Sequence, residues 1–264
     1  MAAMNPFLTT AIKAAHAAAA IHQFHARDID KQIATKTNYA DLVTKVDGQS
    51  EERIREIILE AHPDHGVLGE EMGEYEGSAR SHRWIVDPLD GTLNYAHGFP
   101  FYCVSIALEI DGQVEVGVVL DSVRNHLYSA ERGKGATVNG VPIQVSETSQ
   151  FSQALLSTGF HSTEKAINDN LPVFERALRQ ARAVRRAGAG ALDLCLVASG
   201  QADGFWELTL NPWDVAAGVL ILREAGGRVT DRSGGEYRIT DPVLVSSNSH
   251  IHDELLDVLA IPEL

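Results

Sequence analysis

One short stretch, Trp84 to Thr92, constrains the fold and the chemistry of this chain more than any other. It consists of an apolar run, an aspartate, a proline turn, a second aspartate, a glycine and a threonine. The run predicts a buried strand, and Pro88 and Gly91 predict a sharp turn at its end. Carboxylates three positions apart across a rigid turn can converge on one point, where hard cations such as Mg²⁺ take oxygen ligands. The amides and hydroxyl of Gly91 and Thr92 suit a phosphate.

Composition limits the class of protein. The chain has 264 residues, of which 44% are hydrophobic and 22% charged, as in an ordinary soluble globular protein with one large core or two joined halves. Its net charge of −14 argues against nucleic acid as a primary ligand, since a protein that binds duplex DNA or RNA needs an excess of Lys and Arg. Such a charge should also repel a phosphate ester, unless bound cations reverse the local field.

The expected compartment is the cytoplasm, without a membrane span. No uninterrupted apolar run approaches membrane-spanning length. The Ala-rich N-terminus lacks a basic opening, and Lys13 and His16 interrupt its apolar residues, so it predicts an amphipathic helix rather than a signal peptide. Cys103 and Cys195 lie in apolar runs without CxxC spacing, which indicates buried free thiols rather than a disulfide or a zinc site.

The chain reads as a single catalytic unit, residues 1–264, with two subdomains and no obvious linker. In the first, residues 1–145, apolar periodicity predicts helices over 5–27 and 48–61. It also predicts a strand that ends at Asp87 and two further strands over 101–110 and 113–120, which form a hairpin across Asp111-Gly112. This half should be helices packed on a meandering antiparallel sheet.

The second subdomain, residues 146–264, alternates strands and helices. Strands are expected near 154–158, 204–207 and 243–247, and helices near 163–182, 189–199 and 215–225, with a last helix after residue 247. The fold class is therefore α+β or α/β, and a cleft can form where this half packs on the first.

Carboxylates end apolar stretches in four segments, at Asp47, Glu70-Glu71, Asp87 with Asp90, and Asp214. Each alone has a simpler explanation: Asp47 and Asp214 can cap the helices that follow, and Glu70-Glu71 can be surface charge. Together they favour one site. No HExxH pair occurs and no Cys accompanies the clusters, so oxygen ligation favours Mg²⁺ or Mn²⁺ over zinc. Two such ions can activate water and stabilise the leaving oxygen of a phosphate ester.

Histidine and arginine offer weaker signals. His22 with His25, and His62 with His65, have no accompanying acid or third ligand, and we interpret them as solvated or structural. Arg185-Arg186 is either an anion clamp or a solvated surface pair. Gly188-Ala189-Gly190 lets a ligand approach the backbone at a helix start, which supports the clamp. Gly133-Lys134-Gly135 is not a phosphate-binding P-loop.

These motifs together resemble those of the inositol monophosphatases, within the lithium-sensitive, magnesium-dependent phosphatase superfamily. The resemblance rests on the segment from Trp84 to Tyr95, on Trp213 to Gly218 followed by Glu224 to Gly227, and on two shorter matches, Asp41 to Thr44 with Asp47, and Gly69-Glu70-Glu71, all in order. It spans about residues 5–250. It implies a layered αβαβα sandwich, usually a homodimer, with an N-terminal antiparallel sheet and a C-terminal mixed sheet.

The resemblance also implies roles for individual residues. Glu70, Asp87 and the Leu89 carbonyl would hold one Mg²⁺, and Asp87, Asp90 and Asp214 a second, with a third, weaker ion near Glu70. Thr92, polarised by Asp47, and Glu70 would orient the attacking water. The amides of Gly91 and Thr92 would bind the phosphate of the substrate. The alcohol part of the substrate would lie against Asp90, Asp214, Gly190, Glu207 and Arg185.

The resemblance implies hydrolysis of inositol 1-phosphate or a similar small monoester. Two departures lie on the substrate side: Asn211 stands where animal members commonly carry His, and Gly190 where many carry Ala. Fructose 1,6-bisphosphate, histidinol phosphate and nucleotide 3′-phosphate therefore stay open as substrates. Arg185 to Leu194 and Asp203 to Glu207 look most like the bacterial branch, which leaves room for a further role with RNA or the transcription machinery.

Overall fold

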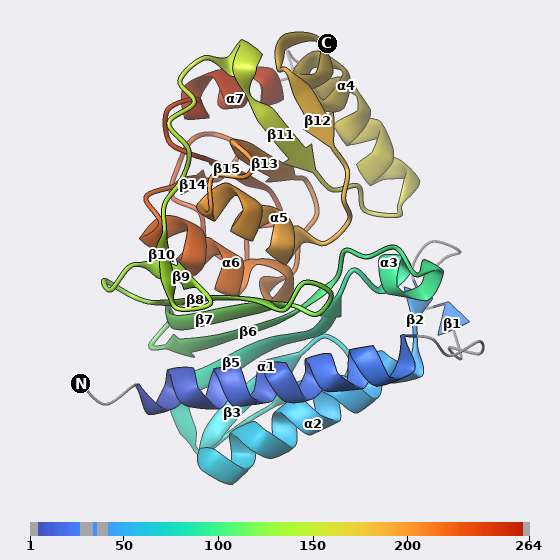
Figure 1. Ribbon diagram of the computed structural model, residues 1–264, viewed down its shortest axis with the longest axis vertical. Helices are drawn as coiled ribbons and strands as arrows, with labels where there is room; N and C mark the ends of the chain where they lie inside the picture. Colours follow the sequence, from blue (N-terminus) through green and yellow to red (C-terminus); the bar gives the residue numbers. More distant parts are fainter. Residues whose placement is uncertain (1–4, 27–33, 36–41, 261–264) are drawn as a thin grey trace.

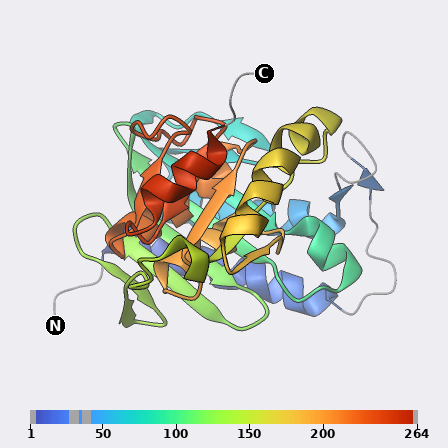
Figure 2. The same cartoon turned by 90° about the horizontal axis from the view of Figure 1, so that it is seen from above.

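The computed structural model describes residues 5–26, 34–35 and 42–260, and in them the chain forms five layers in the order helices, sheet, helices, sheet, helices (Figure 1). Two helices lie under an eight-stranded sheet, two more fill the space between this sheet and a five-stranded sheet, and a last pair covers the far side. The layered αβαβα sandwich expected from the sequence is confirmed. Figure 2 shows the same layers from above.

The first layer consists of α1 (Pro6–His25) and α2 (Lys45–Ala61), which pack on each other and on the large sheet. Asn5 caps α1, with Pro6 at its first position. Helix α2 begins one turn before the expected residue 48, because Thr44 is its cap and Asp47 its third residue. The prediction that Asp47 caps a helix starting at 48 was therefore wrong. Asp41, part of one matched motif, lies outside the described residues.

The large sheet has the strand order β10-β9-β8-β7-β6-β5-β3-β4. Its strands are β3 (His65–Gly69), β4 (Gly73–Tyr75), β5 (Ala79–Asp90), β6 (Cys103–Ile110), β7 (Gln113–Asp121), β8 (His126–Glu131), β9 (Ala136–Val138) and β10 (Val141–Ile143). The meander from β5 to β10 is antiparallel, as expected, including the hairpin at Asp111-Gly112. The exception is β3, which runs parallel to β5, so that the ends of both strands meet at one edge.

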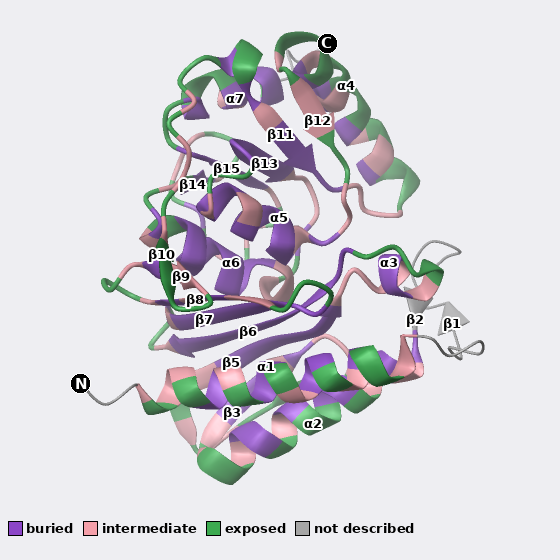
Figure 3. Cartoon of the chain, viewed as in Figure 1, coloured by how far each residue is buried: buried purple, intermediate pink, exposed green. Residues whose placement is uncertain are grey.

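The middle layer holds α5 (Gly190–Ala198) and α6 (Pro212–Glu224). Helix α6 also starts before its expected first residue, since Asn211 is the cap and Asp214 the third residue; the suggestion that Asp214 itself caps the helix was wrong. Most residues of α5 and α6 are buried (Figure 3), because both sheets cover these helices. A short helix that sequence periodicity did not predict, α3 (Thr92–His97), follows the end of β5.

The second sheet has the order β12-β11-β13-β15-β14 and is mixed, with β11 parallel to both of its neighbours. Its strands are β11 (Leu155–Thr158), β12 (Ala183–Arg185), β13 (Gly204–Glu207), β14 (Arg228–Thr230) and β15 (Leu244–Ser247). The outer helices α4 (Glu164–Gln180) and α7 (His252–Leu259) cover it, and a 3₁₀ turn at Phe151–Gln153 precedes it. A two-stranded pair, β1 (Ala34–Thr35) with β2 (Leu42–Val43), stands apart.

Alternation along the strands of the large sheet explains the layering. Trp84 and Val86 of β5 pack with α1 and α2, whereas Ile85 between them faces α5 and α6. Because both faces of the sheet are covered, its central strands are apolar on both sides. Cys103 and Cys195 are buried free thiols, as expected. No helix in the described part of the chain is long and apolar enough to cross a membrane.

Candidate active site

The end of β5 is shaped to present two acids. Asp87 pairs with Ser105 and Asp90 with Cys103, and the register shifts between them, so Pro88 and Leu89 form an irregularity in the strand. The Leu89 amide donates to Asp87 Oδ1 at 3.0 Å. Gly91 follows with φ of 93°, and a Cβ there would lie 2.9 Å from the Phe101 carbonyl oxygen. Only glycine fits this turn, which starts α3 at Thr92.

Four carboxylates from three parts of the chain converge here: Glu70 after β3, Asp87 and Asp90 in β5, and Asp214 in α6. Asp87 is 2% exposed; burial raises its pKa well above the ordinary value, and the charges of Glu70, Asp90 and Asp214 raise it further. Like charges held together in a low-dielectric site repel each other, and a cation among them removes this cost. The donors are all oxygens, which fits Mg²⁺ or Mn²⁺.

The carboxylates do not form a closed cage. Among the described residues, no three His, Cys, Asp or Glu side chains stand close enough together to enclose an ion. The charges of Glu70, Asp90 and Asp214 nevertheless act on Asp87.

Backbone amides hold Asp90 in place. The Ala191 amide, in the first turn of α5, donates to Asp90 Oδ2 at 2.8 Å, and the buried Cys103 thiol lies 3.6 Å from the same oxygen. Burial raises the pKa of Asp90 to about 6, and these hydrogen bonds limit the rise. A helix from the second half of the chain therefore positions an acid of the first.

Asp214 is held by the start of its own helix. Its Oδ2 accepts the Asn211 amide at 2.7 Å, and the carbonyl of Trp213 accepts the Ser105 hydroxyl of β6 at 3.3 Å. Burial raises the pKa of Asp214 to about 8, with further contributions from Asp90 and Glu70. An acid at the third position of a helix can satisfy the cap and still present its other oxygen to a cleft.

Asp47 and Thr92 form a hydrogen-bonded pair. The Thr92 hydroxyl lies 2.9 Å from Asp47 Oδ1 and 3.0 Å from the Leu89 carbonyl oxygen. The other carboxylate oxygen of Asp47 accepts the amide and the hydroxyl of Thr44 at 2.8 and 2.7 Å. Asp47 is fully buried, and burial raises its pKa despite these bonds. Thr92 thus donates to Asp47 and keeps its lone pairs for another donor.

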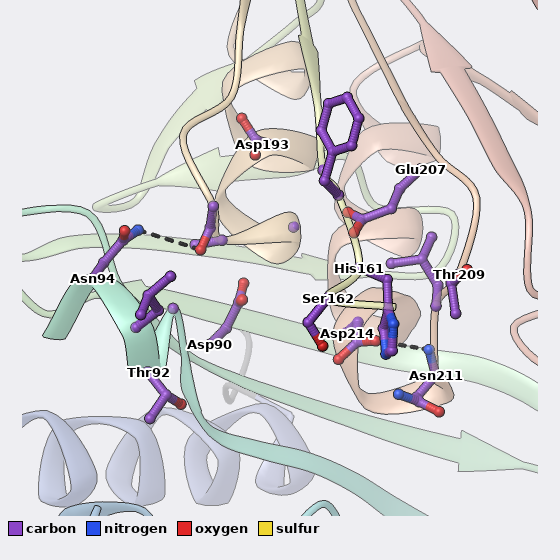
Figure 4. A pocket seen from close by; sticks show the side chains of 18 of the residues that line it. Asp90, Thr92, Asn94, His161, Ser162, Asp193, Glu207, Thr209, Asn211 and Asp214 are labelled. Atoms are coloured by element: carbon purple, nitrogen blue, oxygen red, sulfur yellow. Dashed lines mark hydrogen bonds between the residues drawn. The ribbon is translucent and has the colours of Figure 1, made fainter. Parts of the chain in front are cut away.

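A cavity of about 520 Å³ opens over these groups (Figure 4). Of the residues predicted to act, those on its wall are Glu70, Asp90, Gly91, Thr92, Gly190, Glu207 and Asp214; Asp87, Leu89 and Asp47 lie beneath it. Arg185 does not line this cavity and is exposed beside a separate small pocket, whereas Arg186 lines both. The structure thus places the neighbouring arginine where Arg185 was predicted.

Glu207, at the end of β13, lines the same cavity as Gly91. A Cβ on Gly159 would lie 2.0 Å from Glu207 Oε2, whereas one on Gly190 would lie 3.7 Å away, an ordinary contact. Gly159 therefore makes room for this carboxylate. Burial raises the pKa of Glu207 well above its ordinary value, followed by the charges of Asp214 and Asp193.

Several wall residues escaped the sequence reasoning, among them Phe160, His161, Ser162 and Thr209. They lie in loops after β11 and β13, where no charge pattern or periodicity distinguishes them. Asn94 lies within the motif from Trp84 to Tyr95, and its side-chain amide donates to the carbonyls of Phe101, Ala187 and Gly188 at 2.7, 2.8 and 3.2 Å. The Asn94 side chain therefore links the first half of the chain to the second half beside the cavity.

Comparison with known proteins places this geometry in a family. The profile of the inositol monophosphatase family matches residues 3–261. A curated relative named Nus factor SuhB, from Pasteurella multocida, is 40% identical over 256 residues, which is 96% of each chain. An inositol-1-monophosphatase from Synechocystis is 43% identical over 231 residues, 87% of this chain and 80% of that one.

Solved structures agree. The extragenic suppressor protein SuhB of Bartonella henselae superposes with a TM-score of 0.94 at 35% identity, covering 98% of this chain and 100% of the other. An inositol monophosphatase from Anabaena superposes with a TM-score of 0.86 at 40% identity, covering 96% and 94%. The resemblance inferred from the sequence motifs is therefore confirmed, and the chain belongs to the inositol monophosphatase family.

Proposed function

We propose that the protein is a Mg²⁺-dependent phosphomonoesterase that hydrolyses inositol 1-phosphate, or a similar small monoester, to the alcohol and inorganic phosphate. Membership of the family supports phosphatase chemistry in general terms. The observation that carries the proposal here is the convergence of Glu70, Asp87, Asp90 and Asp214 beside the Asp47–Thr92 pair. An acidic wall without cations would repel the substrate.

The family resemblance implies two ions at this site, with a third, weaker one near Glu70. Glu70, Asp87 and the Leu89 carbonyl would hold the first ion, and Asp87, Asp90 and Asp214 the second. Mg²⁺ or Mn²⁺ bound there lowers the pKa of water and neutralises charge on the phosphate and on the leaving oxygen.

The protein's own groups orient the reactants. Because Thr92 donates its hydroxyl hydrogen to Asp47, its oxygen can accept a hydrogen from the attacking water, and the Glu70 carboxylate can accept the other. The amides of Gly91 and Thr92 can donate to the phosphate oxygens, where negative charge is spread in the transition state. Water then attacks phosphorus in line, and the alcohol leaves toward Asp214, beside which a water can protonate it.

The alcohol side gives less information about the substrate. Glu207 can accept hydrogen bonds from the hydroxyl groups of a polyol, and Gly190 leaves space above it. This pair supports inositol 1-phosphate. Fructose 1,6-bisphosphate, histidinol phosphate and a nucleotide 3′-phosphate use the same phosphate chemistry and remain the alternative substrates.

Phosphate release from these four compounds, with Mg²⁺ and with a chelator in its place, tests the proposal. We expect hydrolysis only with the metal and the highest kcat/KM for inositol 1-phosphate. If inositol 1-phosphate is among the slowest substrates, the assignment of the alcohol is wrong. If no monoester is hydrolysed, the phosphatase proposal fails as a whole.

A second role is favoured by the names of the relatives, several of which are Nus factors. We propose that the protein can also contact the transcription machinery, through protein partners rather than RNA, given its net charge of −14. Co-purification of such a partner with both the wild type and Asp90→Asn would support a role separate from catalysis. Loss of the partner in the variant alone would link partner binding to catalysis.

We also propose that the protein is cytoplasmic and forms a homodimer. Light scattering can test the oligomeric state.

A further inference from the structure

A second acid on α2, Glu51, is fully buried although the catalytic scheme does not use it. It lies four residues after Asp47, so both side chains are on one face of the helix. Asp47 reaches the Thr92 hydroxyl, and Glu51 reaches the turn between β3 and β4, where Glu70 lies. One helix therefore contacts both sides of the site.

The contacts of Glu51 are to the backbone immediately after Glu70. Its Oε2 accepts the Glu71 amide at 2.7 Å and its Oε1 the Met72 amide at 3.1 Å. Arg55, one turn further along α2, lies 3.0 Å from Oε1 and also donates to the Gly73 carbonyl. Glu51 and Arg55 thus hold three successive residues of the turn through charge-assisted hydrogen bonds.

Gly69, the residue before Glu70, has no side chain and so leaves room for the Glu51 carboxylate. A Cβ on Gly69 would lie 2.0 Å from Glu51 Oε1, and the three atoms nearest to it all belong to Glu51. On the other side, the Glu70 amide donates to the Val86 carbonyl at 3.2 Å, directly before Asp87. The backbone around Glu70 is therefore held by α2 from one side and by β5 from the other.

We propose that Glu51 is a positioning residue that sets the affinity of the site for divalent cations by fixing the backbone that carries Glu70. The proposal rests on the metal site of the proposed function. Buried groups that orient a ligand typically change metal affinity by about 10- to 100-fold when replaced. Glu51 touches neither substrate nor the reacting atoms, so its effect should fall on metal binding and leave turnover at saturating metal nearly unchanged.

Binding of Mn²⁺ to the chelator-treated full-length protein tests this, with free Mn²⁺ measured by electron paramagnetic resonance. Glu51→Gln keeps the size of the side chain but turns an amide group toward donors. It should weaken Mn²⁺ binding at least about tenfold, while kcat recovers at saturating Mg²⁺. Glu56→Gln is the matched control: it makes the same change on the same helix, in an exposed pair with Arg53, and should leave Mn²⁺ affinity within about twofold.

Gly69→Ala is the second variant, because it displaces the Glu51 carboxylate without removing it. It should weaken Mn²⁺ binding in the same direction, and it keeps the proposal testable if Glu51→Gln does not fold. Unchanged Mn²⁺ affinity in a folded Glu51→Gln or Gly69→Ala protein would overturn the positioning role. So would a loss of kcat that saturating Mg²⁺ does not restore. Failure of the wild type to bind Mn²⁺ would instead overturn the proposed metal site itself.

Discussion

Neutralising an acid of the site should stabilise the metal-free protein. Burial raises the pKa of Asp90 from 3.8 to about 6 on folding. Between these two pH values the folded state keeps a proton that the unfolded state has lost, so stability falls as pH rises. Each pH unit corresponds to about 1.4 kcal/mol, which gives a cost of about 3 kcal/mol above pH 6.

Asp90→Asn removes this cost while its side-chain oxygen can still accept the Ala191 amide. Without metal and well above pH 6, we expect the variant to be more stable than the wild type by about 2–3 kcal/mol. The difference should shrink as pH falls and vanish near 3.8, where the wild-type carboxyl is also protonated. Mg²⁺ at one thousand times the Kd of the second ion should reverse the order, because only the wild type gains the binding energy of that ion, about 4.1 kcal/mol. The variant should have no turnover.

Urea unfolding across this pH range, with a chelator and then with Mg²⁺, measures both effects. Asp257→Asn, which changes an exposed acid on α7, is the control and should stay within about 0.5 kcal/mol. A metal-free Asp90→Asn protein that is no more stable than the wild type well above pH 6 would refute the idea of a strained acidic site. A gain that is constant at every pH would do the same.

Three further predictions concern the neighbours of the site. Thr92→Val should reduce kcat by about 100-fold or more and destabilise the fold by about 1–3 kcal/mol, because Oδ1 of the buried Asp47 loses the Thr92 donor. Wild-type turnover would contradict this. Gly159→Ala should raise the substrate KM by displacing Glu207, with metal activation unchanged; an unchanged KM would refute the wall assignment. Burial lowers the pKa of His22 to about 4, so the contribution of this residue to stability falls as pH drops from 6.5, by up to about 1.4 kcal/mol per unit. The stability of His22→Gln relative to the wild type should therefore rise over the same range, and a difference that does not change with pH would contradict this.

Most of the layers could be predicted from the sequence, because the helices and strands show the apolar periodicity typical of their type. The first residues of the helices and the directions of the strands could not be predicted. Asp47 and Asp214 were each expected at or before the start of their helices, yet both lie at the third position, because Thr44 and Asn211 supply the caps. The parallel pairing of β3 with β5 also has no local signal, since it depends on contacts between segments distant in sequence.

The candidate site could be predicted where its residues are joined in short motifs. Asp87 to Thr92 is one such motif, and its turn is fixed locally by Pro88 and Gly91. The wall of the cavity was harder to predict, because it is assembled from loops of the second half. Arg186 rather than Arg185 lines the cavity. Because the two arginines are adjacent and β12 has only three residues, the sequence does not show which of the two side chains points into the cavity.

A crystal structure of the protein soaked with Mn²⁺ would test the metal site most directly, because anomalous scattering locates the ion without assumption about the reaction. The ions should lie between Glu70, Asp87, Asp90 and Asp214, with the Leu89 carbonyl as a further ligand. Mn²⁺ bound elsewhere, with these four carboxylates still free of metal at saturating concentration, would contradict the account.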